Sequence, residues 1–251
     1  MTTEDNEQSP FTKPGFIIAA VVVFLIVVLG VVIGFVNANR NDPEPAPSSS
    51  SPTNTSAAPS TEPSAVAGGA SVCGLGGEVL SGSLSTAPEA KWEYQGTTAY
   101  PTSKEFGPGK TNSLGVRSCF QHSPEGAVLA AANATVQGSD SDPKVTKSWL
   151  DYFIAEGPKR EAVLSQGAGA GTSGQGVRIQ VAGFRLLAYE GETARVDIAV
   201  RGAANGQTVT LSMVYDLVWE DGDWKLKVSD ASAPINVANI PDLAGYVTWG
   251  V

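Results

Sequence analysis

Two cysteines and one histidine are the residues of this chain with the most specific chemistry. Cys73, Cys119 and His122 offer three possible metal ligands, whereas a structural zinc ion usually takes four, so we predict no zinc site. A disulfide between Cys73 and Cys119 is expected if this part of the chain lies outside the cytoplasm. It would close a loop of about 45 residues, which is worth on the order of 4 kcal/mol in the chain-entropy model. Two buried free thiols are the alternative.

A second group combines aromatic and acidic side chains. In an enclosed cavity, a tyrosine and an aspartate can abstract a proton beside a carbonyl group. Strand alternation instead points Tyr215 and Trp219 inward and Asp216 outward. Asp151 likewise falls off the apolar face of its predicted helix. We therefore interpret the whole group as structural: Asp151, Tyr152, Tyr189, Tyr215, Asp216 and Trp219.

Three further patterns resemble functional motifs but lack the required surroundings. Residues 169–174 match GxGxxG, yet no strand precedes them and a strand follows, so no helix N-terminus is available for a pyrophosphate. His122 has no nucleophile motif such as GxSxG nearby. The aspartate pairs at 140/142 and 221/223 do not continue into a calcium loop and suit a helix cap and a hairpin. We predict no enzymatic activity, no cofactor and no metal ion.

One apolar stretch, residues 16–36, sets the expected location of the protein. It has no charged side chain, and a helix of this length spans roughly 30 Å, the thickness of a bilayer's hydrocarbon core. We predict a single transmembrane helix in contact with lipid, preceded by a cytoplasmic tail at residues 1–15. Gly30 and Gly34 form a GxxxG pair, a pattern associated with helix dimerisation. Cleavage after Ala38 is the alternative, although signal-peptide cores are usually shorter.

The orientation follows from the size of the segments, because the positive-inside rule is silent. Lys13 and Arg40 place one basic residue on each side of the apolar stretch. The large C-terminal part with both cysteines is therefore expected outside the cytoplasm. Residues 37–71 precede it and are rich in Pro, Ser and Thr, which predicts a disordered stalk whose glycosylation stays open.

The overall charge argues against one class of partner. The chain carries a formal net charge of −9, and its Lys and Arg residues do not cluster. Since phosphate neutralisation needs clustered cations, we do not expect direct binding to nucleic acid.

The folded domain is predicted to cover residues 72–251. Residues 72–122 are rich in Gly and Pro and should form an irregular extension fastened by the disulfide. Residues 123–229 predict helices followed by an antiparallel meander. Ser123 and Asp142 cap two helices that begin with proline, and a shorter helix is expected near 159–165. About four alternating strands follow, with a hairpin at Asp221-Gly222.

The tail, residues 230–251, is too apolar to be a loose end, so it should pack on the sheet or present an edge to a partner. We favour packing. Helices that precede a meander predict an α+β fold, with the helices on one face of a curved sheet.

Several stretches together resemble membrane proteins of actinobacterial integrative and conjugative elements. They are the apolar stretch with its Ser/Pro-rich stalk, CGLGG at Cys73–Gly77, RSCFQHSPEGAVLAAAN at Arg117–Asn133 and VYDLVWEDGDWKL at Val214–Leu226. The outer domains of such proteins are similar to the TcpC-like family and to the bitopic assembly factors of type IV secretion.

The resemblance implies a nuclear-transport-factor-two-like cone, with about three helices on about four antiparallel strands. It also implies a non-enzymatic subunit of a DNA-transfer apparatus that assembles with other envelope subunits or with further copies of itself. A stalked module that binds a small apolar ligand or peptide in the cone cavity is the alternative.

Overall fold

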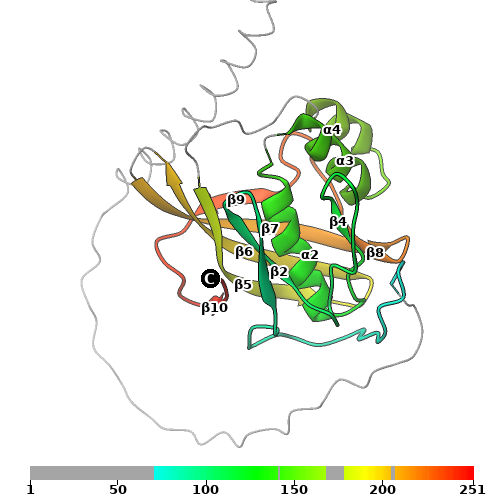
Figure 1. Ribbon diagram of the computed structural model, residues 1–251, viewed down its shortest axis with the longest axis horizontal. Coiled ribbons are helices and arrows are strands. Elements are labelled where there is room, and N and C mark those ends of the chain that lie inside the picture. Colours follow the sequence, from blue (N-terminus) through cyan, green and yellow to red (C-terminus); the bar gives the residue numbers. More distant parts are fainter. Residues whose placement is uncertain (1–70, 141, 168–177, 205–206) are drawn as a thin grey trace, which may run out of the picture. The chain divides into compact units, whose positions relative to one another are not determined.

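The computed structural model describes residues 71–140, 142–167, 178–204 and 207–251 (Figure 1). Four predicted segments therefore lie outside the described residues: the tail 1–15, the span 16–36 with Gly30 and Gly34, the stalk up to residue 70, and the GxGxxG match at 169–174. Within the described part of the chain, no helix combines the length and the apolarity that crossing a membrane requires.

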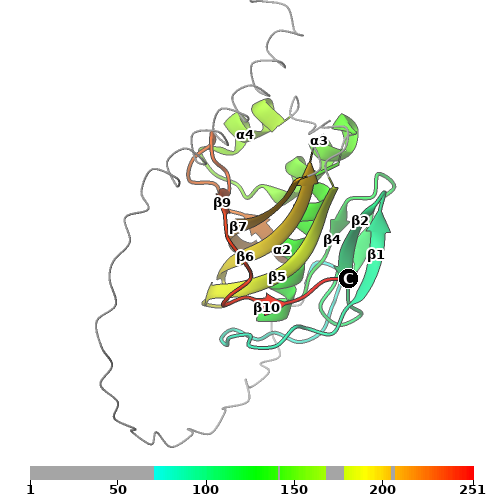
Figure 2. The same cartoon turned by 90° about the vertical axis from the view of Figure 1, so that its left-hand side faces the viewer.

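Helix α2 (Pro124–Gln137) lies at the centre of the domain. It starts where predicted, because the Ser123 hydroxyl accepts a hydrogen bond from the Gly126 N–H at 3.0 Å and Pro124 occupies the first turn. All of its residues except Glu125 are buried. The helix is surrounded on both sides: a curved sheet covers one side and a β-hairpin the other (Figure 2). Its many alanines allow this close approach.

The curved sheet is built on four consecutive strands in antiparallel order, of which the first three are long. These are β5 (Arg178–Tyr189), β6 (Thr193–Ala204), β7 (Gln207–Glu220) and β8 (Asp223–Leu226). Register shifts after Val181 and after Leu186 interrupt the pairing of β5 with β6, and such bulges bend a sheet. Asp221 and Gly222 form the turn into β8 with positive φ angles of 55° and 75°, as the Asp-Gly signal predicts.

The C-terminal tail adds two strands to this sheet. Strand β9 (Asn236–Asn239) pairs with β7, and β10 (Val247–Thr248) pairs with β5. Beyond β10, Trp249 is buried with its ring edge-on to Trp92 at 5.2 Å and to Phe184 at 5.5 Å. Packing, rather than a loose or projecting tail, is thus the observed arrangement.

The region before α2 is more regular than expected. Strands β1 (Lys91–Gln95) and β2 (Thr98–Thr102) form a hairpin, and the short β3 (Lys110–Thr111) pairs with β4 (Arg117–Ser118). The disulfide between Cys73 and Cys119 fastens this region, as predicted. Ser71, assigned above to the stalk, is already buried, and its hydroxyl accepts a hydrogen bond from the Leu75 N–H.

The two remaining helices form a corner beside β8. Helix α3 (Pro143–Phe153) is capped by Asp142, which accepts the Lys144 N–H at 2.8 Å. It ends at Phe153, because Ile154 is extended and bridges to Leu226 of β8. Helix α4 (Arg160–Gly167) follows.

The predicted fold class, a nuclear-transport-factor-two-like cone of about three helices on about four strands, is wrong. The main sheet has six strands, and the described residues contain ten strands in three sheets but only three helices. The error has two physical sources. The tail completes ladders on β5 and β7, and the residues before α2 form hairpins that cover the side of α2 turned away from the sheet.

Gly126 lies in the first turn of α2 at an unusually close backbone contact. A Cβ placed there would lie 2.0 Å from the Gln121 carbonyl oxygen. Gly-to-Ala replacement inside a helix ordinarily stabilises by about 0.5–1 kcal/mol. Here we expect Gly126→Ala to destabilise by about 1–3 kcal/mol, since the helix must shift to relieve the overlap. Urea unfolding followed by tryptophan fluorescence measures this.

Gly76→Ala is the matched control for this substitution. A Cβ at Gly76 meets no atom within 4 Å, and its φ angle is not in the left-handed region. We expect a change within about 0.5 kcal/mol at this site. Equal effects of the two substitutions would contradict the proposed overlap.

Candidate functional site

The most elaborate polar centre in the domain surrounds the carboxylate of Asp223. This residue opens β8 and has no exposed surface. Its Oδ2 accepts the Cys119 N–H at 2.6 Å, and its Oδ1 accepts the N–H groups of Phe120 and Trp224, each at 2.9 Å. The hydroxyl of Tyr152 also donates to Oδ2. Four donors therefore converge on one buried carboxylate.

Local backbone geometry explains why two consecutive N–H groups reach Asp223. Cys119 has a positive φ of 69°, a conformation that few non-glycine residues adopt, and its disulfide to Cys73 spans a Cα–Cα distance of 5.9 Å. Two residues further on, the Gln121 carbonyl accepts the indole N–H of Trp224 at 3.0 Å. The two sequence stretches Arg117–Asn133 and Val214–Leu226 thus meet at this point.

Burial controls the protonation chemistry of this centre. It raises the pKa of Asp223, against the lowering effect of the hydrogen bonds from Tyr152, Phe120 and Cys119. Burial and the charge of Asp223 also raise the pKa of Tyr152 above its ordinary value. The phenol therefore keeps its proton and serves as a donor. An aspartate with four donors and a tyrosine that holds its proton form a structural link rather than an acid–base pair.

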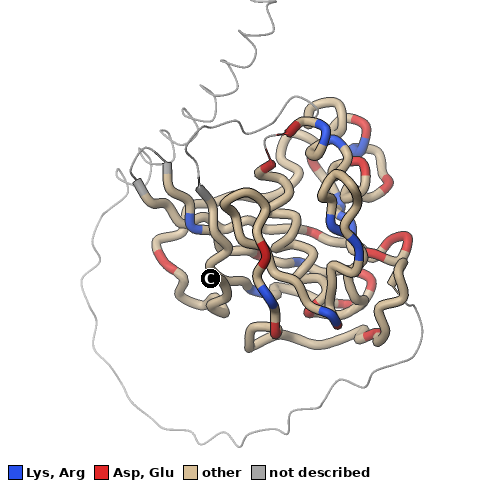
Figure 3. The backbone as a smooth tube through the Cα atoms, in the orientation of Figure 1, with Lys and Arg blue, Asp and Glu red and all other residues tan. Residues whose placement is uncertain are grey.

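A cleft of about 280 Å³ opens beside this centre, between the α3–α4 corner and the β7–β8 turn. Lys225 lines it, although only 6 % of that residue is exposed. Its ammonium donates to the Tyr152 carbonyl at 2.8 Å and lies 3.2 Å from the centre of the Tyr152 ring. Glu220 and Asp221 line the same cleft, and the β7–β8 turn is visibly acidic (Figure 3).

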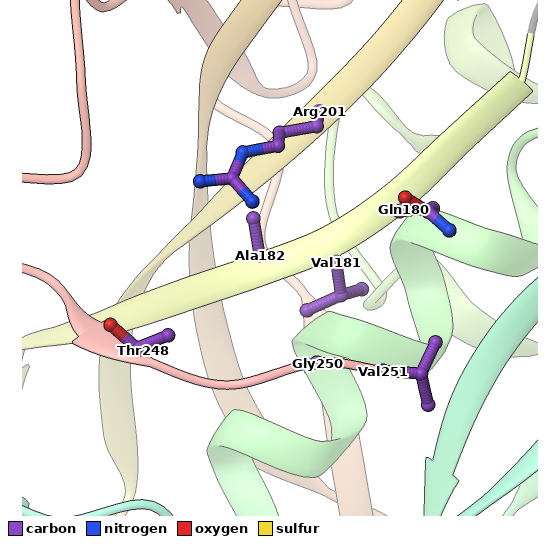
Figure 4. Close-up of a pocket in the computed structure, with 7 residues that line it drawn as sticks. All are labelled: Gln180, Val181, Ala182, Arg201, Thr248, Gly250 and Val251. Atoms are coloured by element: carbon purple, nitrogen blue, oxygen red, sulfur yellow. The ribbon is translucent and has the colours of Figure 1, made fainter.

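A smaller cleft of about 120 Å³ lies where the C-terminal segment crosses β5 (Figure 4). Gln180, Val181 and Ala182 line it from β5, and the guanidinium of Arg201 reaches it from β6. Its size and its single charged side chain make it the weaker candidate.

The structure disperses most of the aromatic and acidic candidates. Tyr215 is buried and its hydroxyl contacts Thr135 at 2.9 Å. Asp216 lies on the other face and faces Arg195 at 3.5 Å. Asp151 forms an ion pair with Lys147 at 2.8 Å. Of the six residues, only Asp151 and Tyr152 line one cleft.

His122 and the two remaining aromatic candidates form a separate cluster at the β5–β6 turn. The imidazole stacks on Trp219 at 4.0 Å, and its Nδ1 lies 2.6 Å from Oε1 of Glu78. The Tyr189 hydroxyl donates to the Val79 carbonyl at 2.6 Å. These contacts fasten residues 78–79 to the domain. The described residues contain no cluster of His, Cys, Asp or Glu suited to a metal ion.

Sequence reasoning missed Lys225 as a candidate. Strand alternation could have found it, because Lys225 lies two residues after Asp223 and therefore on the same side of β8. It could not reveal that the α3–α4 corner covers that side, since the corner is distant in sequence.

Buried tyrosines should make the protein sensitive to alkali. Burial raises the pKa of Tyr152, Tyr189 and Tyr215 above the ordinary 10.0. A group whose pKa is higher in the folded state contributes stability that is present below 10.0 and lost as pH rises above it. We expect these three tyrosines to ionise only as the domain unfolds, so tyrosinate absorbance and fluorescence should change together.

Tyr215→Phe separates the contribution of one buried tyrosine to this alkaline loss of stability from groups that act in the opposite direction. Burial lowers the pKa of Arg117, to about 10, and that of Lys225, so both favour the folded state as pH rises. The variant should lose stability less steeply than the parent between pH 10 and pH 12. Identical slopes would argue against a raised pKa at Tyr215.

Fold and site together define a strand-rich domain, closed by one disulfide and a buried carboxylate centre, with a polar cleft beside that centre. A family model described as a domain of unknown function (DUF8175) matches residues 50–248, so the chain belongs to this family. No curated protein and no solved structure matches the chain significantly.

Proposed function

We propose that this chain is a non-enzymatic protein of the cell envelope, held at the cell membrane through residues 16–36, with its folded domain outside the cytoplasm. The observation that carries this proposal is the disulfide between Cys73 and Cys119. Disulfides form and persist mainly in oxidising compartments, and this one ties the first residues of the domain to its interior. A cytoplasmic domain would rarely depend on such a bond.

Within the envelope, we assign the domain a structural role as an assembly subunit of a conjugative, type IV secretion-like DNA-transfer apparatus. Its partners are other envelope subunits or further copies of itself. The resemblance described above supports this role. So does the use of its polar groups, because Asp223 and Trp224 of one resembling stretch bond to residues 119–121 of the other. Polar groups that hydrogen-bond to one another in this way stabilise the fold and are not available to bind a substrate.

An apolar ligand inside the domain has no specific observation in its favour. The space between α2 and the sheet is occupied by large side chains without exposed surface, among them Trp224, Phe184 and Leu129. The two clefts described above lie elsewhere, and each has charged as well as apolar side chains in its lining.

Deletion of the gene tests the assembly role. We expect transfer of the element to be abolished or strongly reduced, and to be restored by the full chain. A second complementing chain, with residues 16–36 replaced by an unrelated apolar span of equal length, should also restore transfer if these residues only tether the domain. Undiminished transfer in the deletion strain would overturn the role.

Protease treatment of intact cells tests the location separately. A tag at the C-terminus should be removed from intact cells, whereas a tag at the N-terminus should be lost only after lysis. Protection of the C-terminal tag in intact cells would overturn the proposed orientation, whatever the result for transfer.

A further inference from the structure

The cleft between the α3–α4 corner and the β7–β8 turn contains a buried cation that is only partly paired. An ammonium group carries three N–H donors. For Lys225, the carbonyl of Tyr152 takes one of them and the Tyr152 ring faces the group. No described carboxylate forms an ion pair with it. A buried ammonium in this state favours a further acceptor, because unpaired buried charge is costly.

Carboxylates line the same cleft without touching that ammonium. Asp221 makes no hydrogen bond and no ion pair within the described residues. Oε1 of Glu220 accepts the Glu156 N–H at 2.9 Å. The second carboxylate oxygen of Glu220 makes no hydrogen bond and no ion pair within the described residues. Arg160 and Glu156 also line the cleft, but they already form an ion pair at 3.2 Å. Arg160 also donates a hydrogen bond to the Asp151 carbonyl at 2.8 Å.

The pKa of Lys225 agrees with this arrangement. Burial lowers it, and the charges of Asp223, Asp221 and Glu220 act in the opposite direction. Asp221 and Glu220 are therefore near enough to influence the ammonium electrostatically. Both of them line the cleft of about 280 Å³ together with Lys225.

We propose that this cleft binds a small zwitterion of the amino-acid type, with its carboxylate on Lys225 and its ammonium on Asp221 and Glu220. The carboxylate of such a ligand accepts the remaining N–H donors of Lys225, and its ammonium neutralises the acidic β7–β8 turn. Charge-assisted hydrogen bonds of this kind are among the stronger polar contacts. The volume suits a free amino acid or a dipeptide, because pockets for drug-sized ligands span roughly 300–1,000 Å³.

The inference goes beyond the assembly role and does not depend on it, because binding is measured on the purified full chain in mild detergent. Three small probes separate the charges: diglycine carries both, N-acetylglycine only the carboxylate, and glycinamide only the ammonium. Titration calorimetry should show diglycine binding about tenfold more tightly than either single-charge probe, or tighter still. Equal binding of the three probes, or no binding of diglycine, would overturn the proposal.

Two variants locate the binding within the cleft. Lys225→Met removes the ammonium but keeps the aliphatic stem, and Asp221→Asn removes a rim charge at a φ of 55° that asparagine tolerates. Each should weaken diglycine binding about tenfold. Lys225→Met should leave glycinamide binding unchanged, and Asp221→Asn should leave N-acetylglycine binding unchanged.

Asp242→Asn is the matched control, because it makes the same charge change outside the cleft and keeps the acceptor that bonds the Ala244 N–H. It should bind diglycine like the parent. If Lys225→Met does not fold, Asp221→Asn alone decides the matter. Unchanged diglycine binding in Asp221→Asn, or an equal loss in Asp242→Asn, would refute the site.

Discussion

Asp223→Ala should lower the free energy of unfolding by about 3–5 kcal/mol. The substitution removes the acceptor for the N–H groups of Cys119, Phe120 and Trp224 in a place without exposed surface. Buried donors left without a partner incur their full desolvation cost. The Tyr152 hydroxyl loses its acceptor as well, so the contact between α3 and β8 should loosen.

Urea unfolding of the full chain in mild detergent, followed by the fluorescence of its five tryptophans, measures this loss. All five tryptophans belong to the described domain, so the signal reports on its unfolding. Asp216→Ala is the control, because Asp216 is partly exposed and its contact with Arg195 is 3.5 Å long. Its effect should stay within about 0.5–1 kcal/mol. A loss for Asp223→Ala no larger than that would contradict a structural role for the centre.

Tyr152→Phe separates the two parts of the Asp223 centre. It removes one of four donors and leaves the three backbone N–H groups paired. We expect a loss of about 1–2 kcal/mol, clearly below that of Asp223→Ala. The reverse order would assign the main stabilising role to the α3 contact instead.

Removal of the disulfide should have the second large effect. The double variant Cys73→Ala/Cys119→Ala should lose about 4 kcal/mol, because the bond spans 46 positions in sequence and restricts the unfolded chain accordingly. The same urea titration measures the change.

Reductant provides an internal comparison for this prediction. The parent chain in excess dithiothreitol should unfold at the same urea concentration as the double variant, and the double variant should not respond to dithiothreitol. A parent chain that is unaffected by full reduction would contradict the stabilising role of the bond. It would also weaken the argument that the domain is adapted to an oxidising compartment.

The sequence predicted the local elements of this domain well, because their signals are short-range. Ser123 and Asp142 each cap a helix that begins with proline. Asp221 and Gly222 form the hairpin turn, and both adopt the positive φ angles that this turn requires. The end of α3 could not be predicted in this way. Ile154 leaves the helix to pair with Leu226, a residue far away in sequence.

The candidate site shows the same division. Asp223 was visible from the sequence as part of an Asp-Gly-Asp turn, and its pairing with the N–H groups of residues 119 and 120 was not. That contact joins positions more than one hundred residues apart, at a point where Cys119 has a positive φ and two consecutive N–H groups face Asp223. Lys225 could not be recognised as a candidate from the sequence either, because the helix that covers it, α3, is distant in sequence.

By itself, the sequence determined the apolar stretch at 16–36, the cysteine pair and the order of the helices before the long strands that follow them. Periodicity, capping and composition are properties of neighbouring residues, so one chain suffices to read them. Only the tertiary structure decided the architecture and the site. Strands β9 and β10 join the sheet, the β1–β2 hairpin covers α2, and Lys225 borders a cleft because segments distant in sequence bury one another's surfaces.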